Sequence, residues 1–135
     1  MLQNYDMIEK FYSNFGNRIK KIKSILNRPL TFSEKILYNH LFNSLEGSFI
    51  RGIDYVGFRP DRLAMQDATA QMALLQFIIA NREKTELPTT VHCDHLIQAQ
   101  VGAEVDMKNA MTINSEVYDF LESVSKIFGL GFWKP

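Results

Sequence analysis

Apolar side chains recur every three or four residues near the start of the chain, at Ile8, Phe11, Phe15, Ile19, Ile22 and Leu26. This spacing predicts an amphipathic helix with one apolar face. Gly16 lies inside the pattern and weakens the helix, so a break into two helices at this residue is the alternative. Pro29 is expected to end the helix, because proline cannot continue the backbone hydrogen bonding.

A second helix is predicted directly after Pro29. Thr31 and Glu34 fit a capping box, in which the Thr31 hydroxyl accepts a hydrogen bond from the Glu34 amide and the Glu34 carboxylate reaches back to the backbone of Thr31. The apolar positions of this helix are Ile36, Leu37, Leu41 and Leu45. The pattern therefore predicts N-terminal helices over about residues 6–46.

The rest of the chain alternates between β-favouring and helical segments. The β-favouring runs are Gly52–Arg59, Leu63–Met65, Thr89–His92 and Leu130–Trp133. Helical spacing occurs over Ala68–Asn81, with Asp67 as the expected N-cap, and over Val105–Phe128, which Gly129 is expected to end. The first of these helices is apolar on most sides, which is typical of a buried helix. Strands that alternate with helices predict an α/β fold with parallel strand pairing.

Composition and charge narrow the classes of function. The chain has 135 residues, of which 46% are hydrophobic, as in an ordinary soluble domain. Fifteen basic residues balance fifteen acidic ones, so the net charge of zero gives no support for a nucleic-acid partner. No apolar run reaches the roughly 18–20 residues of a membrane span. The basic face of the first helix fits a membrane surface or a solvated face, and zero net charge favours the second interpretation.

The start of the chain and the cysteine count bear on the compartment. Asp6 and Glu9 are unlike the basic, acid-poor start of a mitochondrial transit peptide, and no apolar core of a secretory signal follows Met1. The single cysteine, Cys93, cannot form an internal disulfide, which favours a reducing compartment. We expect a cytoplasmic protein, with the mitochondrial matrix as the alternative.

Four chemically active side chains are consecutive in the middle of the chain: His92, Cys93, Asp94 and His95. A metal site requires converging ligands, whereas alternate residues of a strand face opposite ways. A Cys–His nucleophile requires the base within reach of the thiol, which sequence neighbours seldom achieve. In an acid–base pair, Asp94 orients the imidazole of His95 and favours its protonated form. A purely structural cluster is the remaining alternative.

Two longer stretches carry a resemblance to a known family: RPDRLAMQDATAQMALLQF at residues 59–77 and TVHCDHLIQA at residues 90–99. Both resemble the N-terminal part of aconitase (aconitate hydratase), as do EKILY at residues 34–38, NSEVYDFL at 114–121 and GFWKP at 131–135. The resemblance implies an incomplete three-layer α/β/α first domain of the aconitase type. Its N-terminal helices precede an α/β portion over about residues 50–135, and the remaining domains of the family are absent.

The resemblance also implies an activity and roles for three residues. Enzymes of the family interconvert citrate and isocitrate through cis-aconitate, and an iron of their 4Fe–4S cluster acts as a Lewis acid on the leaving hydroxyl. By resemblance, Asp94 and His95 are the catalytic pair that protonates this hydroxyl. Gln66 is the glutamine that hydrogen-bonds a carboxylate of the tricarboxylate substrate. His92 and Cys93 match the motif as structural neighbours, so no metal ligand is implied in this chain.

The chain departs from the aconitase pattern in several features, and these departures limit the activity that we predict for it. The cluster cysteines, the serine base and the substrate-binding arginines of the family fall beyond Pro135, and Cys93 alone cannot hold a cluster that needs three thiolates. The β-favouring run before Pro135 is also left without a closing element. We expect the N-terminal part of an aconitate hydratase, inactive alone. The alternatives are a subunit of a split enzyme that pairs with a cysteine-bearing chain, and a non-enzymatic remnant that binds a partner.

Overall fold

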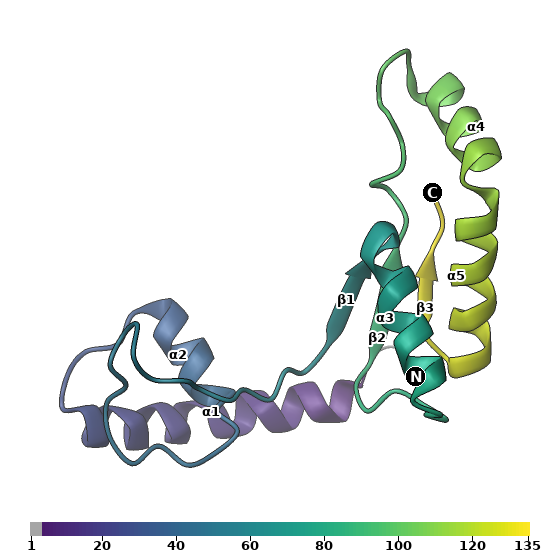
Figure 1. The fold of residues 1–135 in the computed structure, drawn as a ribbon. Helices are drawn as coiled ribbons and strands as arrows, with labels where there is room; N and C mark the ends of the chain where they lie inside the picture. The colour runs from purple at the N-terminus through teal and green to yellow at the C-terminus, as the bar shows by residue number, and fades with distance from the viewer. Residues whose placement is uncertain (1–3) are drawn as a thin grey trace. The chain divides into compact units, whose positions relative to one another are not determined.

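The computed structural model describes residues 4–135. The first three residues, which entered the prediction of the compartment, lie outside the described part. Within it the chain forms two compact units, Asn4–Pro60 and Asp61–Pro135, and Figure 1 shows the elements of each. The first unit holds α1 (Tyr5–Leu26) and α2 (Phe32–Asn39). The elements of the second unit are, in order, β1 (Leu63–Gln66), α3 (Asp67–Ile79), β2 (Thr89–His92), α4 (Ala103–Ile113), α5 (Ser115–Phe128) and β3 (Gly131–Trp133).

Helix α1 confirms the amphipathic pattern but not the predicted boundaries. It runs through Gly16 without a break, because a single glycine costs only about 1 kcal/mol relative to alanine and the turns on both sides outweigh it. It ends before Pro29, at Asn27, which adopts a left-handed conformation with φ of 48° and donates its backbone N–H to Lys23. Asparagine tolerates this conformation, so it ends the helix before the proline does.

Helix α2 begins as predicted and ends earlier. The capping box is present: the Glu34 amide donates to the Thr31 hydroxyl over 3.2 Å, and the Thr31 amide donates to the Glu34 carboxylate over 2.8 Å. The helix stops at Asn39, so Leu41 and Leu45 lie outside it. His40 is its C-cap.

The strand predicted at Gly52–Arg59 is wrong. Only an isolated antiparallel bridge forms there, between Leu41 and Phe58. The amides of Ile53 and Asp54 both donate to the carbonyl of Ile50, which bends the chain at the start of the segment. Because the bend takes up the first three residues of this short run, too few residues remain to extend the bridge into a ladder.

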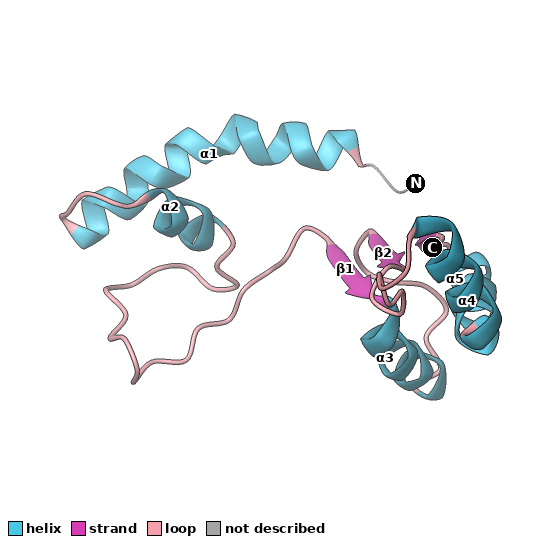
Figure 2. Cartoon of the chain, turned by 90° about the horizontal axis from the view of Figure 1, so that it is seen from above, coloured by secondary structure: helices cyan, strands magenta, loops and turns pink. Residues whose placement is uncertain are grey.

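The second unit contains a three-stranded parallel sheet in the order β1-β2-β3, which confirms the predicted α/β fold. Helices α3 and α5 cover the same face of this sheet, as Figures 1 and 2 show. This arrangement follows from the right-handed crossovers that join neighbouring parallel strands. Within Asp61–Pro135 no helix covers the opposite face, so this unit supplies two of the three layers that the resemblance implied.

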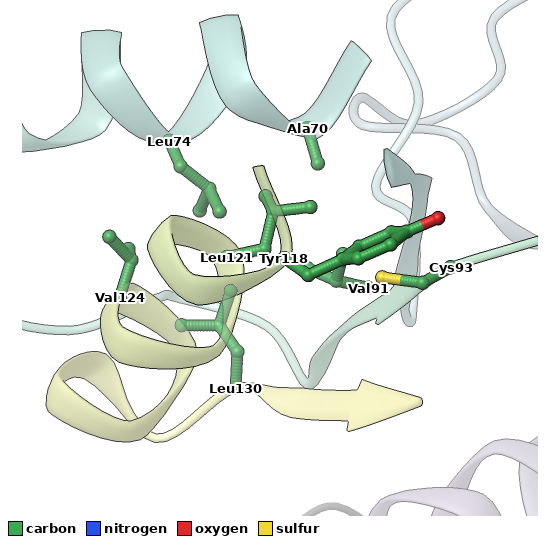
Figure 3. Packing of buried hydrophobic residues seen from close by; sticks show 8 residues of the cluster. All are labelled: Ala70, Leu74, Val91, Cys93, Tyr118, Leu121, Val124 and Leu130. Atoms are coloured by element: carbon green, nitrogen blue, oxygen red, sulfur yellow. The ribbon is translucent and has the colours of Figure 1, made fainter. Parts of the chain in front are cut away.

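The core of this unit lies between the sheet and its two helices (Figure 3). It consists of Ala70, Leu74, Val91, Cys93, Tyr118, Leu121, Val124 and Leu130. The strand register aligns Met65, Val91 and Phe132 in one row, and all three contribute to this core. The next residue of each strand therefore points to the opposite face of the sheet.

Two helix predictions in this unit need correction. The expected N-cap, Asp67, is the first residue of α3, and the helix is not buried all round: Met72, Leu75 and Ile79 are exposed. The helix expected over Val105–Phe128 is two helices, α4 and α5. They meet at Asn114, whose side-chain amide donates to the carbonyls of Ala110 and Leu96 and so competes with continuous helix.

Gly129 ends α5 in a left-handed conformation with φ of 72°, as predicted.

None of the helices formed by residues 4–135 combines the length and the apolar character needed to cross a bilayer.

Candidate active site

The predicted site residues come together at one edge of the parallel sheet. Gln66 ends β1, and its register partner His92 ends β2. Asp94 and His95 follow β2 directly, in the loop that leaves the sheet. Carboxyl ends of parallel strands share one edge, where α/β proteins commonly bind ligands. Gln66, Asp94 and His95 therefore lie at the same edge.

His95 is held by carboxylates through one of its two ring nitrogens. Its Nδ1 lies 2.6 Å from Oδ1 of Asp94, so the contact expected between these residues is present. The same Nδ1 lies 3.6 Å from Oδ1 of Asp67. The side chains of His95 and Asp94 are 52% and 72% exposed. Both carboxylates approach Nδ1, so Nε2 is left for a ligand.

Asp67 is the residue of this site that sequence reasoning missed. It was interpreted as a helix cap, yet its side chain is fully buried, with 0% exposure. Its Oδ1 accepts from the amide of Ala68 over 2.8 Å. Its Oδ2 is buried and has no hydrogen-bond partner among the described residues. The signal in the sequence is an acidic residue placed between an apolar strand and an apolar helix.

Gln66 has a side chain that the helix start does not use. It occupies the N-cap position of α3 with extended backbone, at φ of −86° and ψ of 156°, and its side chain makes no cap hydrogen bond. It is partly buried. The helix N-terminus beside it favours negative charge.

His92 makes packing contacts at the same edge. Its ring stacks on Trp133 with centroids 5.0 Å apart, and its Nε2 lies 2.9 Å from the Thr90 hydroxyl. Both partners belong to the second unit and hold the ring against the sheet. His92 is thus a structural neighbour of the Asp94–His95 pair.

Cys93 lies in the core and is 3% exposed. Burial raises the pKa of Cys93 to about 11, and the negative charges of Asp67 and Asp94 add to this effect. At this pKa the thiol is protonated at neutral pH, whereas the thiolate is the form that acts as a nucleophile or a metal ligand. No group of three or more His, Cys, Asp or Glu side chains in residues 4–135 is arranged to hold a metal ion.

Comparison with known proteins gives one consistent result. Residues 34–135 match the model of the aconitase family (aconitate hydratase). The mitochondrial aconitate hydratase of Saccharomyces cerevisiae is 55% identical over 135 residues, which are 100% of this chain and 17% of that protein. The mitochondrial aconitate hydratase of Gracilaria gracilis is 50% identical over 134 residues, 99% of this chain and 17% of that protein. The chain thus spans about a sixth of the length of these relatives.

Proposed function

The chain belongs to the aconitase family as an N-terminal segment, and from this premise we propose that it supplies an acid–base pair to an aconitate hydratase. The observation that carries the proposal is the 2.6 Å contact between Asp94 and Nδ1 of His95 at the sheet edge. In this role the whole protein interconverts citrate and isocitrate through cis-aconitate. The 135 residues form the start of its first domain, with N-terminal helices before an α/β portion.

The proposed chemistry uses the two nitrogens of His95 differently. Elimination of water requires a proton on the departing hydroxyl, and a protonated imidazole at the site edge delivers it from Nε2. Asp94 fixes the ring by accepting from Nδ1 and stabilises the positive charge before the transfer. In the reverse direction, hydration, Nε2 takes a proton from the added water. Gln66 donates from its side-chain amide to a substrate carboxylate and so orients the substrate.

The residues of this chain do not fit the 4Fe–4S cluster of the family. A cluster of this kind is held by cysteine thiolates, and the only cysteine, Cys93, is buried in the core with its pKa raised to about 11. We therefore place the cluster ligands in another part of the enzyme. That part is either the continuation of the polypeptide or a separate subunit.

The comparisons with known proteins change the cellular compartment that we propose. The acidic residues Asp6 and Glu9 favoured the cytoplasm, with the mitochondrial matrix as the alternative. The relatives from Gracilaria gracilis and Saccharomyces cerevisiae are both named as mitochondrial enzymes. We propose the mitochondrial matrix. Localisation of the tagged full-length protein in its own cells is the direct measurement.

A chimeric enzyme tests the proposed function. Residues 1–135 replace the matching segment of the Saccharomyces cerevisiae relative, and hydration of cis-aconitate is measured. We expect an active chimera, and we expect His95→Gln to lower kcat by about 10²–10⁴-fold, the usual size of general acid–base catalysis. His92→Gln is the matched control, because the contacts of this histidine are with Trp133 and the Thr90 hydroxyl and not with Asp94, and its kcat should stay within a few-fold. A folded chimera that keeps its activity after His95→Gln contradicts the proposal.

The isolated chain gives the complementary test. Residues 1–135 alone, supplied with iron and sulfide, should show no turnover of cis-aconitate, because one protonated thiol cannot assemble the cluster. Mixing this chain with the remaining segment of the yeast relative should restore activity if the two parts associate. Turnover by the isolated chain overturns the assignment of the cluster to another part of the enzyme.

A further inference from the structure

We infer that Asp67 is a positioning residue for His95, a second carboxylate that holds the imidazole and its charge from the side of the core. The inference rests on the proposed function, in which His95 is the acid. Asp94 holds Nδ1 of His95 from the solvent side, at 2.6 Å. Asp67 approaches the same nitrogen from α3, at 3.6 Å. The imidazole thus lies between an exposed and a buried carboxylate.

Burial distinguishes the two carboxylates. The Asp94 side chain is 72% exposed, so solvent screens its charge and its long-range field is weak. The Asp67 side chain is 0% exposed, so its field acts in a medium of low polarity. Solvent therefore screens the interaction of Asp67 with the half-exposed imidazole less than it screens that of Asp94. Asp67 also keeps the ring in one orientation while substrate enters and leaves.

Among the described residues, His95 is the positive partner of Asp67. A buried carboxylate without a compensating charge or donor is costly, and Oδ2 of Asp67 has no hydrogen-bond partner among the described residues. The hydroxyl of Tyr118 is likewise buried and unpaired within residues 4–135, so it does not satisfy Asp67. Backbone N–H groups of α3 contribute only the bond from Ala68. Protonation of His95 places a positive charge 3.6 Å away.

The neighbouring titratable groups respond to the charge of Asp67. Burial raises the pKa of Tyr118, and the negative charge of Asp67 raises it further. Burial likewise raises the pKa of Cys93 to about 11, with Asp67 the next contributor. These groups from α5 and from the end of β2 remain neutral at physiological pH. Asp67 from α3 and Asp94 from the loop are then the two anions that act on His95.

The competing explanation gives Asp67 a local role only. An acidic residue in the first turn of a helix is favourable in itself, and Oδ1 accepts from the amide of Ala68. Asp67→Asn separates the two explanations, because asparagine keeps the size of the side chain and an oxygen for this amide but loses the charge. A local role of Asp67 is kept after the substitution, whereas the support that its charge gives to His95 is lost.

The test follows His95 directly, by the rate of its modification with diethyl pyrocarbonate at neutral pH. Tandem mass spectrometry of the chimera reports each histidine separately. For Asp67→Asn we expect His95 to react faster, because its ring loses one of the two carboxylates beside Nδ1 and is held less firmly. The rates for His92 and His40 should not change. The readout does not require turnover, so it stands even if the chimera proves inactive.

A matched control uses another buried carboxylate of the chain. Asp106 is 4% exposed and accepts from the amides of Val101 and Gly102, far in sequence from the site. Asp106→Asn should leave the reaction rate of His95 unchanged. In the active chimera, Asp67→Asn should lower kcat about tenfold with KM within about twofold, since part of the general-acid contribution is lost. A reaction rate of His95 that changes equally in both variants, or in neither, overturns the inference.

A second variant covers the case in which Asp67→Asn does not fold. Asp94→Asn removes the exposed carboxylate and leaves the buried one in place. We expect His95 to react more slowly with diethyl pyrocarbonate in this folded variant than in the chain unfolded in urea, because Asp67 still holds the ring. A rate equal to that of the unfolded chain shows that Asp94 alone holds the imidazole, and the role of Asp67 is then refuted.

Discussion

The two units of this chain differ in how they bury apolar side chains. In Asp61–Pro135, a sheet and two helices enclose a core of eight buried residues. In Asn4–Pro60 the buried hydrophobic residues are Ile22 and Leu30, while Phe32, Phe42 and Tyr55 are 75%, 56% and 101% exposed. A parallel sheet with crossover helices makes its own core, whereas two helices and a long loop do not. The candidate site lies on the unit with the core.

This difference has a functional meaning. An acid–base pair must be held within fractions of an ångström, and packing of the supporting residues is what holds it. Asp67 and Cys93 are buried members of the second unit, and they lie next to Asp94 and His95. The first unit offers no such support, and its exposed apolar side chains are typical of a surface that contacts another protein segment.

The largest expected effect compares one leucine from each unit. Leu121 is fully buried and Leu37 is 50% exposed. Leu121→Ala should lower the free energy of unfolding by about 2–5 kcal/mol, because it leaves a cavity in the core. Leu37→Ala should lower it by less than about 1 kcal/mol. Urea unfolding followed by circular dichroism measures both, and fluorescence of the single tryptophan, Trp133, reports on the second unit. Equal losses would remove the contrast between the units.

The second largest effect concerns the reactivity of the Cys93 thiol in the core. The pKa of Cys93 is raised from 9.0 to about 11, chiefly by burial. At pH 8 the fraction of thiolate is then about 100-fold lower than for an ordinary cysteine, and only the thiolate reacts. The reaction of the chain with Ellman's reagent should be at least about 100-fold slower in the folded than in the urea-unfolded state. Equal rates would mean that the second unit does not keep its core closed.

The sequence predicted the α/β unit better than the N-terminal unit, for a physical reason. Runs such as Thr89–His92 become strands because both neighbours in the sheet pair with them. The run Gly52–Arg59 has similar β-favouring side chains, but it finds one bridge partner, Leu41, and stays irregular. Pairing partners are remote in sequence, so local composition does not reveal them. The capping box of Thr31 and Glu34 was predictable because all of its atoms lie within one turn.

The candidate site was predictable in part. Asp94 and His95 are adjacent in the sequence, and the contact between their side chains follows from this adjacency. The approach of Asp67 to His95 joins residues from α3 and from the loop after β2, and it depends on the parallel register of β1 and β2. Periodicity also failed to show that Asp67 is fully buried, because a charged residue at a helix start is normally solvated.

A smaller effect is expected at the start of α2. The Thr31 hydroxyl accepts from the amide of Glu34 over 3.2 Å. Thr31→Ala removes this cap and should lower the free energy of unfolding of the N-terminal unit by about 1 kcal/mol. Thr112→Ala is the matched control, because the Thr112 hydroxyl donates to the carbonyl of Lys108 inside α4 and caps nothing. Thermal unfolding monitored by circular dichroism compares the two, and a larger loss for Thr112→Ala would contradict the capping role.

The smallest effect concerns the pH dependence of the same helix start. The pKa of Glu34 is lowered from 4.5 to about 2, first by the hydrogen bond from Arg28 and then by the bond from the Thr31 amide. A lowered pKa in the folded state means that the stabilisation is complete above about pH 4.5 and is lost as the pH falls towards 2. The ion pair is partly exposed, so its contribution is modest. In a plot of the free energy of unfolding against pH, Glu34→Gln should flatten this part of the curve. The shape of the curve above pH 5 should not change. The difference between the urea midpoints of the two proteins, measured from pH 2 to 6, isolates Glu34 from the other carboxylates. A constant difference would show that the Arg28–Glu34 contact contributes nothing to the stability of the N-terminal unit.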